Sequence, residues 1–322
     1  MKKALITGVA GQDGSYLAKY LLKKNYQVTG ILKESQINNL FRHEYLGINN
    51  KIEYSTLDLL DLKVVEKYLK ENRPDEIYNL AAYSSVGYSF KEPYKILKNN
   101  NTIILNLLES MRRIGERIKL YQAGSSEMYG NPSTLPVTLD TPINPISPYG
   151  LSKAFGYHSV KNYRRNYNLF AVTGIMFNHE SFLRDENYFI KKLIKQALKL
   201  KSGEIKKIYF GNIEVKRDFG FSPDYIKAMW KMLQNDRPKD YIVCSGESIS
   251  LKSVIDHVFE RLNLSTDRVE TKKSLYRPSE IKNIYGENSR IKKELNWKYD
   301  KSFFDVLEIL IEEETDQFNS SA

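Results

Sequence analysis

The sequence has few of the features that mark secreted or membrane proteins. Cys244 is its one cysteine, which excludes an internal disulfide and any metal site built from cysteines. No run approaches the about 18 apolar residues that a spanning helix needs, and the first apolar run, at 4–7, begins almost at the N-terminus. We therefore expect no signal peptide, no membrane partner and a location in the reducing cytoplasm.

Acidic residues are outnumbered by basic ones, 39 to 49, which gives a net charge of +10. A local excess of lysine at 190–211 could bind nucleic acid or a polyphosphate, although such an excess more commonly forms a solvated lysine-rich face. No recognition motif accompanies the charge, so we expect no nucleic-acid partner. Histidine and cysteine form no ligand cluster in the sequence, and we expect no metal ion.

Three glycines, Gly8, Gly11 and Gly14, separate an apolar run from an amphipathic segment in "ALITGVAGQDGSYLAKYLLKK". Leu17 and Leu21 recur at helical spacing, so the predicted order is strand, glycine turn, helix. A helix N-terminus offers free N–H groups to a phosphate, and glycines let a pyrophosphate approach the backbone. The pattern therefore predicts a dinucleotide site, with a glycine turn that holds no ligand as the alternative.

Strand-like and helical runs alternate through the first half of the chain. The strand-like runs lie at 26–32, 51–61, 75–85 and 118–130. Such alternation predicts a parallel sheet with helices on both faces, and a nucleotide bound outside the carboxyl ends of the strands.

The run 168–178 is a further core strand, and beyond it the pattern becomes less regular, with loops rich in Asn, Arg and Asp. A chain of 322 residues with 41% hydrophobic content can form one large or two modest domains. We predict a core domain over 1–178 and a mainly substrate-binding domain over 179–322, with some later segments returning to the core.

The chemistry is expected around "SPYGLSK" at 147–153. Tyr149 and Lys153 are four residues apart on a helical segment, so they share one face. An ammonium beside a phenol favours the phenolate and lowers its pKa, which suits a general acid/base for carbinol–carbonyl chemistry. Ser125, just past a strand end in "AGSSEMYG", can hydrogen-bond the reacting oxygen.

These motifs resemble the extended short-chain dehydrogenase/reductase family. The resemblance is closest to the GDP-mannose 4,6-dehydratases, whose blocks recur in order from residue 4 to about residue 298. The blocks are "TGVAGQDGSYLAKYLL", "IYNLAA", "YQAGSSEMYG", "SPYGLSKAFGY", "NLFAVTGIMFNHES", "GNIEVKRDFGFSPDYIKAMWKMLQ", "YRPSEI" and "KKELNWK". The resemblance implies a Rossmann-type doubly wound parallel sheet, a nicotinamide cofactor and a smaller mixed domain for a GDP-sugar substrate.

The resemblance also implies roles for individual residues. Catalysis would fall to Ser125, Glu127, Tyr149 and Lys153, where Glu127 is the additional carboxylate that a dehydratase needs and a plain dehydrogenase or epimerase does not. Cofactor binding would fall to Thr7, Gly8, Gly11, Gln12, Asp13, Gly14, Lys33, Asp58, Leu59, Leu80, Ala81, Ala82, Asn100, Tyr149, Lys153, His179 and Arg184. Substrate binding would fall to Ser84, Ser125, Glu127, Asn178, Lys192, Arg217, Arg277 and Glu280.

Two segments depart from the family pattern. After the second strand the family carries arginines for the 2′-phosphate of NADP, whereas this chain reads "LKESQINNLFRHEYL" from Leu32. Lys33 favours NADP over NAD, although Glu34 can instead take a ribose hydroxyl. In "NHESFLRD", Phe182 and Asp185 replace a proline and a glycine that we expect beside the sugar pocket.

The sequence thus predicts an NAD(P)-dependent hydro-lyase, a 4,6-dehydratase of GDP-mannose or a related GDP-sugar such as a GDP-manno-heptose. A 4-epimerase or 4-reductase of the same fold is the alternative among enzymes. A dinucleotide-binding sensor without turnover is the alternative outside them. We expect a homodimer or homotetramer.

Overall fold

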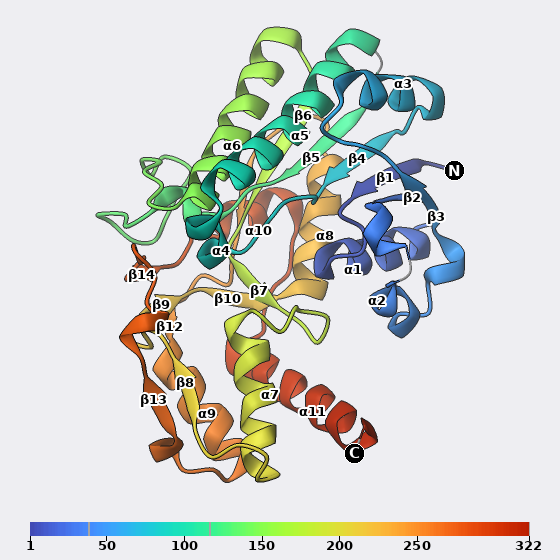
Figure 1. The fold of residues 1–322 in the computed structure, drawn as a ribbon. Helices are drawn as coiled ribbons and strands as arrows, with labels where there is room; N and C mark the ends of the chain where they lie inside the picture. The colour runs from blue at the N-terminus through green and yellow to red at the C-terminus, as the bar shows by residue number, and fades with distance from the viewer. Residues whose placement is uncertain (38, 116, 322) are drawn as a thin grey trace.

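The computed structural model describes residues 1–37, 39–115 and 117–321 (Figure 1). Position 38, inside the segment that departs from the family pattern, and position 322 lie outside this description. Within the described residues, a seven-stranded sheet has the order β11-β6-β5-β4-β1-β2-β3, with every neighbouring pair parallel. The strands are β1 (Lys3–Thr7), β2 (Gln27–Leu32), β3 (Glu53–Thr56), β4 (Glu76–Asn79), β5 (Lys119–Ala123), β6 (Phe170–Met176) and β11 (Tyr241–Val243).

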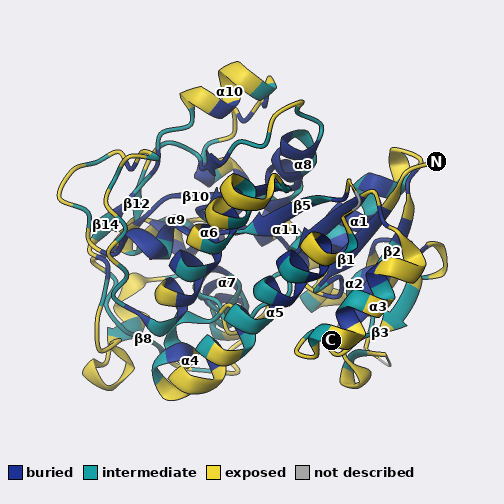
Figure 2. Cartoon of the chain, turned by 90° about the horizontal axis from the view of Figure 1, so that it is seen from above, coloured by how far each residue is buried: buried dark blue, intermediate teal, exposed yellow. Residues whose placement is uncertain are grey.

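This order confirms the doubly wound sheet. The strand order changes direction at β1, which pairs with β2 on one side and β4 on the other. Helices therefore leave β1 and β4 toward opposite faces, and a crevice opens between them at the carboxyl ends of the strands. Figure 2 shows β1 and β5 as buried and the edge strand β3 as more accessible, as expected for a parallel sheet covered on both faces.

Helices cover both faces of the sheet. One face carries α1 (Gln12–Lys23) and α8 (Ser222–Leu233), which share one apolar core with β1 and β2. The other face carries α3 (Leu62–Asn72), α5 (Pro93–Ile114) and α6 (Pro148–Tyr167), packed over Leu5, Ile77 and Leu120. Two short helices, α2 (Phe41–Tyr45) and α4 (Val86–Lys91), lie in loops that follow β2 and β4.

Three predicted strands are shorter than their sequence patterns suggested. The run 51–61 forms a strand only over Glu53–Thr56, the run 75–85 only over Glu76–Asn79, and the run 118–130 only over Lys119–Ala123. The residues that follow leave the sheet and line the cleft described below. Among them, Leu57, Leu59 and Ala81 also pack against the apolar core of the sheet, which gives the same sequence pattern as burial in a strand.

A smaller lobe lies below the sheet in Figure 1. It contains α7 (Phe189–Lys201), α9 (Leu251–Leu262) and α11 (Phe303–Ser321), which share a separate apolar core. Its short strands are β7 (Asn178–Glu180), β8 (Ile208–Phe210), β9 (Lys216–Arg217), β10 (Phe219–Phe221), β12 (Ile249–Ser250), β13 (Val269–Thr271) and β14 (Asn283–Ile284). Residues of α8, β11 and α10 (Ser289–Leu295) pack in the core of the large sheet. The domain boundary near residue 178 stays a prediction.

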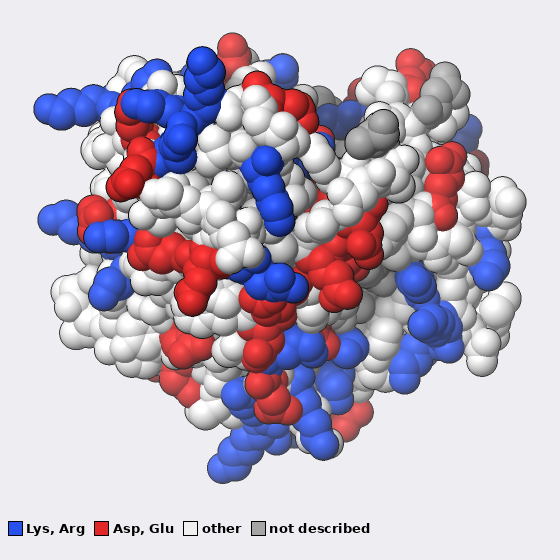
Figure 3. Space-filling model, turned by 90° about the horizontal axis from the view of Figure 1, so that it is seen from below, with Lys and Arg blue, Asp and Glu red and all other residues white. Residues whose placement is uncertain are grey.

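The lysines at 190–211 are partly neutralised by neighbouring acidic residues. Lys191 pairs with Glu314, and Lys195 pairs with Glu186. Figure 3 shows blue and red side chains interspersed on the face seen from below. Among the residues that the structure describes, no helix is both long and apolar enough to cross a bilayer.

Candidate active site

One deep cleft, of about 1020 Å³, follows the carboxyl ends of the sheet strands and passes between the sheet and the smaller lobe. The loops after β1, β2, β3, β4, β5 and β6 all contribute to its lining. A cleft of this size lies at the upper end of the range for small-molecule sites. Its place matches the crevice where ligands bind in doubly wound sheets.

The glycine turn forms one end of the cleft. Gly8 has φ of +72°, and a Cβ there would lie 2.8 Å from the Ala81 nitrogen. A Cβ on Gly14 would lie 2.4 Å from the Gly8 carbonyl oxygen, so both positions require glycine. Helix α1 begins directly after Gly11. Because glycine has no side chain, the first N–H groups of α1 have no side-chain cap. A diphosphate group can accept these free donors.

The loops after β2 and β3 continue the lining away from the glycine turn. Leu32, Lys33, Asp58 and Leu59 all line this part of the cleft. The Lys33 ammonium lies 4.6 Å from the centre of the Tyr83 ring, whose loop borders the same space. A cation is therefore available where a Rossmann-type site receives the ribose of the first nucleotide.

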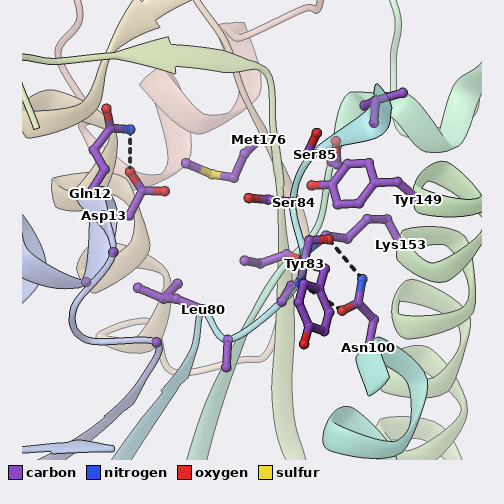
Figure 4. Close-up of a pocket in the computed structure, with 18 of the residues that line it drawn as sticks. Gln12, Asp13, Leu80, Tyr83, Ser84, Ser85, Asn100, Tyr149, Lys153 and Met176 are labelled. Atoms are coloured by element: carbon purple, nitrogen blue, oxygen red, sulfur yellow. Dashed lines mark hydrogen bonds between the residues drawn. The ribbon is translucent and has the colours of Figure 1, made fainter. Parts of the chain in front are cut away.

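Ser125, Tyr149 and Lys153 meet in the middle of the cleft. Ser125 follows β5 and caps the 3-10 helix Ser126–Tyr129, while Tyr149 and Lys153 lie in the first turns of α6. The Ser125 hydroxyl lies close enough to the Tyr149 phenol to lower the pKa of Tyr149. The Lys153 ammonium donates to the Ala123 carbonyl oxygen at 2.8 Å. Figure 4 shows Tyr149 and Lys153 projecting from α6 into the pocket, opposite Gln12 and Asp13.

The sequence predicted that Lys153 lowers the pKa of Tyr149, and this prediction is wrong. Burial raises the pKa of Tyr149 and outweighs the opposite effect of Ser125. Burial lowers the pKa of Lys153 to about 8, although the negative charge of Asp13 acts to raise it. The ammonium is directed at a backbone carbonyl, 5.5 Å from the centre of the Tyr149 ring, and both side chains lose most of their hydration.

We predict that Lys153→Met stabilises the protein in the absence of ligands. The pKa of Lys153 falls from 10.5 to about 8 on folding, so its protonation opposes folding fully below about pH 8 and ceases to do so as the pH rises towards 10.5. After allowing for the lost hydrogen bond, the free energy of unfolding at pH 7 should rise by about 1–3 kcal/mol. Urea unfolding measures it, with the exposed Lys161→Met on the same helix as control. A destabilised Lys153→Met with an unchanged control would contradict this account.

Glu127 lies next to Ser125, Tyr149 and Lys153, on the side of the smaller lobe. It stands in the 3-10 helix that Ser125 caps, and its backbone N–H donates to the Ser125 hydroxyl at 3.2 Å. Burial raises the pKa of Glu127, while the positive charges of Arg217 and Arg277 act in the opposite direction. A carboxyl group with a raised pKa can both take and return a proton near neutral pH.

Two arginines and a glutamate form the far end of the cleft. Buried Arg217 donates to the Ile281 carbonyl oxygen at 2.6 Å and lies 3.6 Å from the Glu280 carboxylate. Arg277, which is more exposed, lies 3.7 Å from the same carboxylate. Guanidinium forks suit phosphate oxygens, and a carboxylate suits vicinal hydroxyls, so this end fits a nucleoside diphosphate.

Most residues expected in the site line the cleft. These are Gly8, Gly11, Gln12, Asp13, Gly14, Lys33, Asp58, Leu59, Leu80, Ala81, Ala82, Ser84, Asn100, Ser125, Glu127, Tyr149, Lys153, Asn178, His179, Arg184, Arg217, Arg277 and Glu280. Thr7 and Lys192 lie outside the lining: Thr7 is fully buried and donates to Asn79, and the Lys192 ammonium lies 5.8 Å from the centre of the Phe210 ring.

Phe182 and Asp185 also lie outside the lining, contrary to the expectation that they border the sugar pocket. The Phe182 ring packs on Tyr45 at 4.8 Å, and Arg42 donates to the neighbouring Leu183 carbonyl oxygen at 2.7 Å. The two segments that depart from the family pattern therefore contact each other. Proximity to motif residues in the sequence could not show on which side of the 181–185 loop each side chain lies.

Tyr188 is a cleft residue that the sequence did not reveal. Its hydroxyl lies 2.6 Å from the Ser84 hydroxyl, and the Arg184 guanidinium carbon lies 3.6 Å from the centre of its ring. It stands between the irregular 181–187 loop and α7, and no periodic pattern distinguishes it from the other tyrosines in a chain with 23 of them.

No group of three or more His, Cys, Asp or Glu side chains within the described ranges could hold a metal ion.

The glycine turn at β1, the parallel sheet and the Ser125–Tyr149–Lys153 group define an extended short-chain dehydrogenase/reductase. The family model described as GDP-mannose 4,6 dehydratase matches residues 5–310. The chain belongs to the GDP-mannose 4,6-dehydratase family, which confirms the resemblance seen in the sequence.

Three relatives illustrate the match. The chain is 40% identical to GDP-mannose 4,6 dehydratase 1 of Arabidopsis thaliana, over 97% of this chain and 90% of the relative. It is 36% identical to the human GDP-mannose 4,6 dehydratase, over 96% and 90%. It is 34% identical to the GDP-mannose 4,6-dehydratase of Vibrio cholerae serotype O1, over 100% and 95%.

Solved structures share the fold. A UDP-glucose 4-epimerase from Thermotoga maritima has a TM-score of 0.86 at 20% identity, covering 98% of this chain and 99% of that one. A dTDP-glucose 4,6-dehydratase from Streptomyces venezuelae, with NAD bound, has a TM-score of 0.86 at 20% identity, covering 96% of each. At these identities the likeness shows the fold alone.

Proposed function

We propose that this protein is a GDP-sugar 4,6-dehydratase that acts on GDP-mannose or a related GDP-sugar such as a GDP-manno-heptose. The observation that carries the proposal is the place of Glu127, a carboxyl group with a raised pKa in the same cleft as Ser125, Tyr149 and Lys153. An alcohol dehydrogenase or an epimerase at C4 has no step for this carboxylate. Removal of water across C5 and C6 requires it.

The residues of the cleft divide the reaction between them. Tyr149 takes the proton of the C4 hydroxyl, and the Ser125 hydroxyl holds the reacting oxygen in line with the phenol. Glu127 then takes the C5 proton, made acidic by the neighbouring ketone, and returns a proton to the hydroxyl that leaves C6 as water. A bound nicotinamide would supply hydride acceptance from C4 and hydride return to C6, and the proton that Tyr149 took from the C4 hydroxyl balances the one that C5 then regains.

The cleft fits a nicotinamide dinucleotide. Gly8, Gly11 and Gly14 give the diphosphate a close backbone approach, and a side chain at Gly8 or Gly14 would clash with the backbone. Lys153 lies beside Tyr149, where it can hold the ribose of the nicotinamide. NAD is bound in solved relatives, including a UDP-glucuronic acid 4-epimerase from Bacillus cereus at 25% identity.

We favour NADP over NAD. Leu32 rather than an acidic residue ends β2, and the ammonium of the next residue, Lys33, lies over the Tyr83 ring beside the expected ribose site. An acidic residue at the strand end is the usual partner of an NAD ribose, and a cation suits the additional phosphate of NADP.

The cytoplasmic location and the homo-oligomer remain predictions. Exposed apolar side chains on α5 and α6, such as Tyr94 and Leu151, are compatible with association.

We predict that Arg277→Ala weakens GDP binding. Loss of a charge-assisted pair to a phosphate should cost about 1.5–3 kcal/mol, which is roughly a 10- to 150-fold rise in Kd. Isothermal titration with GDP measures it. Arg290→Ala is the matched control, because Arg290 also pairs with a glutamate on the surface but lies outside the cleft. Equal affinity of Arg277→Ala and the parent for GDP would remove Arg277 from the site.

A panel of sugar nucleotides tests the proposed substrate class. GDP-mannose and GDP-manno-heptose should lose one water, detected by mass spectrometry of the product, whereas UDP-glucose and dTDP-glucose should remain intact. A 4-epimerase would leave every mass unchanged. Turnover of dTDP-glucose in preference to both GDP-sugars would contradict the assignment of the nucleotide.

A further inference from the structure

A pair of charged side chains, the buried His179 and the half-buried Asp13, lies beside the glycine turn. Asp13 stands in the first turn of α1, and His179 lies on β7, 166 positions later. His179 Nε2 lies 2.8 Å from Asp13 Oδ2, and both residues line the cleft. His179 Nδ1 lies 2.7 Å from the Phe177 carbonyl oxygen. Each ring nitrogen of His179 therefore faces an acceptor.

This geometry fixes the protonation of His179. A neutral imidazole has one N–H donor and one lone pair, so one of its nitrogens would face an oxygen without a proton between them. The imidazolium has two N–H groups and satisfies both oxygens. The ionised form of Asp13 has hydrogen-bond donors at both carboxylate oxygens. Oδ2 faces His179, and Oδ1 accepts from the Ser222 hydroxyl at 2.9 Å and from the Gln12 amide at 3.0 Å.

The surroundings of His179 favour the cation on balance. Burial alone favours the neutral ring, but the charge of Asp13 and the two hydrogen bonds raise the pKa of His179 above its ordinary value. The Arg184 guanidinium opposes this, and the Glu180 carboxylate on β7 is stabilised by the same imidazolium. From α8, the Tyr225 ring stacks on the imidazole at 5.1 Å. Conversely, His179 keeps the pKa of Asp13 below its ordinary value.

The position of Asp13 presents a problem for the ligand expected here. Asp13 lies between Gly11 and Gly14 in the sequence, in the first turn of α1, and lines the cleft beside the turn that should receive a dinucleotide's diphosphate. An uncompensated carboxylate beside that diphosphate would repel it and would compete for the positive end of α1. A partner of opposite charge removes the net repulsion.

We infer that Asp13 is a positioning residue that holds His179 as an imidazolium, and that this neutral pair permits the glycine turn to accept a dinucleotide's diphosphate. The second half of the inference rests on the proposed function, and the first half does not. The pair also joins α1, β7 and α8 around the turn, through Asp13, His179 and Ser222.

Nitrogen-15 NMR of histidine-labelled protein, without added ligand, tests the first half. The chain has four histidines, so the signals can be assigned by single substitutions. His179 should show two protonated ring nitrogens at pH 7.5, and Asp13→Asn should convert it to a neutral ring. Glu308→Gln, which removes the partner of His257 at 2.6 Å, is the matched control and should leave His179 unchanged. A neutral His179 in the parent protein would overturn the inference.

Dinucleotide binding to the full chain, measured by titration calorimetry with NADP and with NAD, tests the second half. His179→Asn removes the cation 2.8 Å from the Asp13 carboxylate and leaves it only the charge of Arg184, so the Kd should rise roughly 10- to 100-fold. Asp13→Asn/His179→Asn removes both charges and should bind more tightly than His179→Asn alone. A double variant that binds no better than His179→Asn would overturn the charge-compensation role. If the parent binds neither dinucleotide, the proposed function fails while the NMR result still decides the state of His179.

Discussion

Replacing Glu127 with glutamine is expected to stop the reaction after hydride removal from C4. The amide keeps the shape of the side chain but cannot take the C5 proton or protonate the leaving hydroxyl. Reduced nicotinamide should accumulate with the 4-keto sugar, and formation of the dehydrated product should fall by about 100-fold or more. Absorbance of the reduced nicotinamide, recorded beside the product mass, measures both effects.

The matched control for this variant is Glu287→Gln, a half-buried glutamate outside the cleft. It should turn over GDP-mannose at the parental rate. A Glu127→Gln enzyme that released the 6-deoxy-4-keto product as fast as the parent would remove Glu127 from the elimination step. The raised pKa of Glu127 would then reflect burial without a catalytic purpose.

Replacing Tyr149 with phenylalanine is expected to block the reaction one step earlier. Without the phenol, no group at this position can take the C4 hydroxyl proton, and the turnover number should fall by about 1000-fold. No reduced nicotinamide should appear, which distinguishes Tyr149→Phe from Glu127→Gln in the same absorbance measurement.

Tyr157→Phe provides the control for Tyr149→Phe, because Tyr157 is buried on the same helix but does not line the cleft. Binding of GDP-mannose to Tyr149→Phe should stay within a few-fold of the parent, since the loss concerns proton transfer. Accumulation of reduced nicotinamide in Tyr149→Phe would show that another group acts as the base for the first step.

The sequence predicted well the features that depend on local spacing. Gly8 and Gly14 lie where a side chain would meet the backbone, so their pattern is tied to the turn itself. Tyr149 and Lys153 share a helix face because four residues make about one turn. The order of strands and helices gave the parallel sheet, since each crossover needs its own helix.

Features that depend on burial or on distant contacts could not be predicted in this way. The raised pKa of Tyr149 results from the surrounding protein, which the i, i+4 spacing to Lys153 does not describe. Asp13 and His179 meet across 166 positions, and no local pattern connects them. Phe182 packs on Tyr45 because the 181–185 loop turns this side chain away from the cleft.

Incubation with GDP-mannose deuterated at C4 tests the central claim most directly. If the protein oxidises C4, removes water across C5 and C6 and returns the same hydride, the product will be lighter by one water and will carry the deuterium at C6. Mass spectrometry with proton NMR of the sugar reports both. A product that has lost no water, with the deuterium still at C4 or exchanged with solvent, would contradict the assignment as a GDP-sugar 4,6-dehydratase.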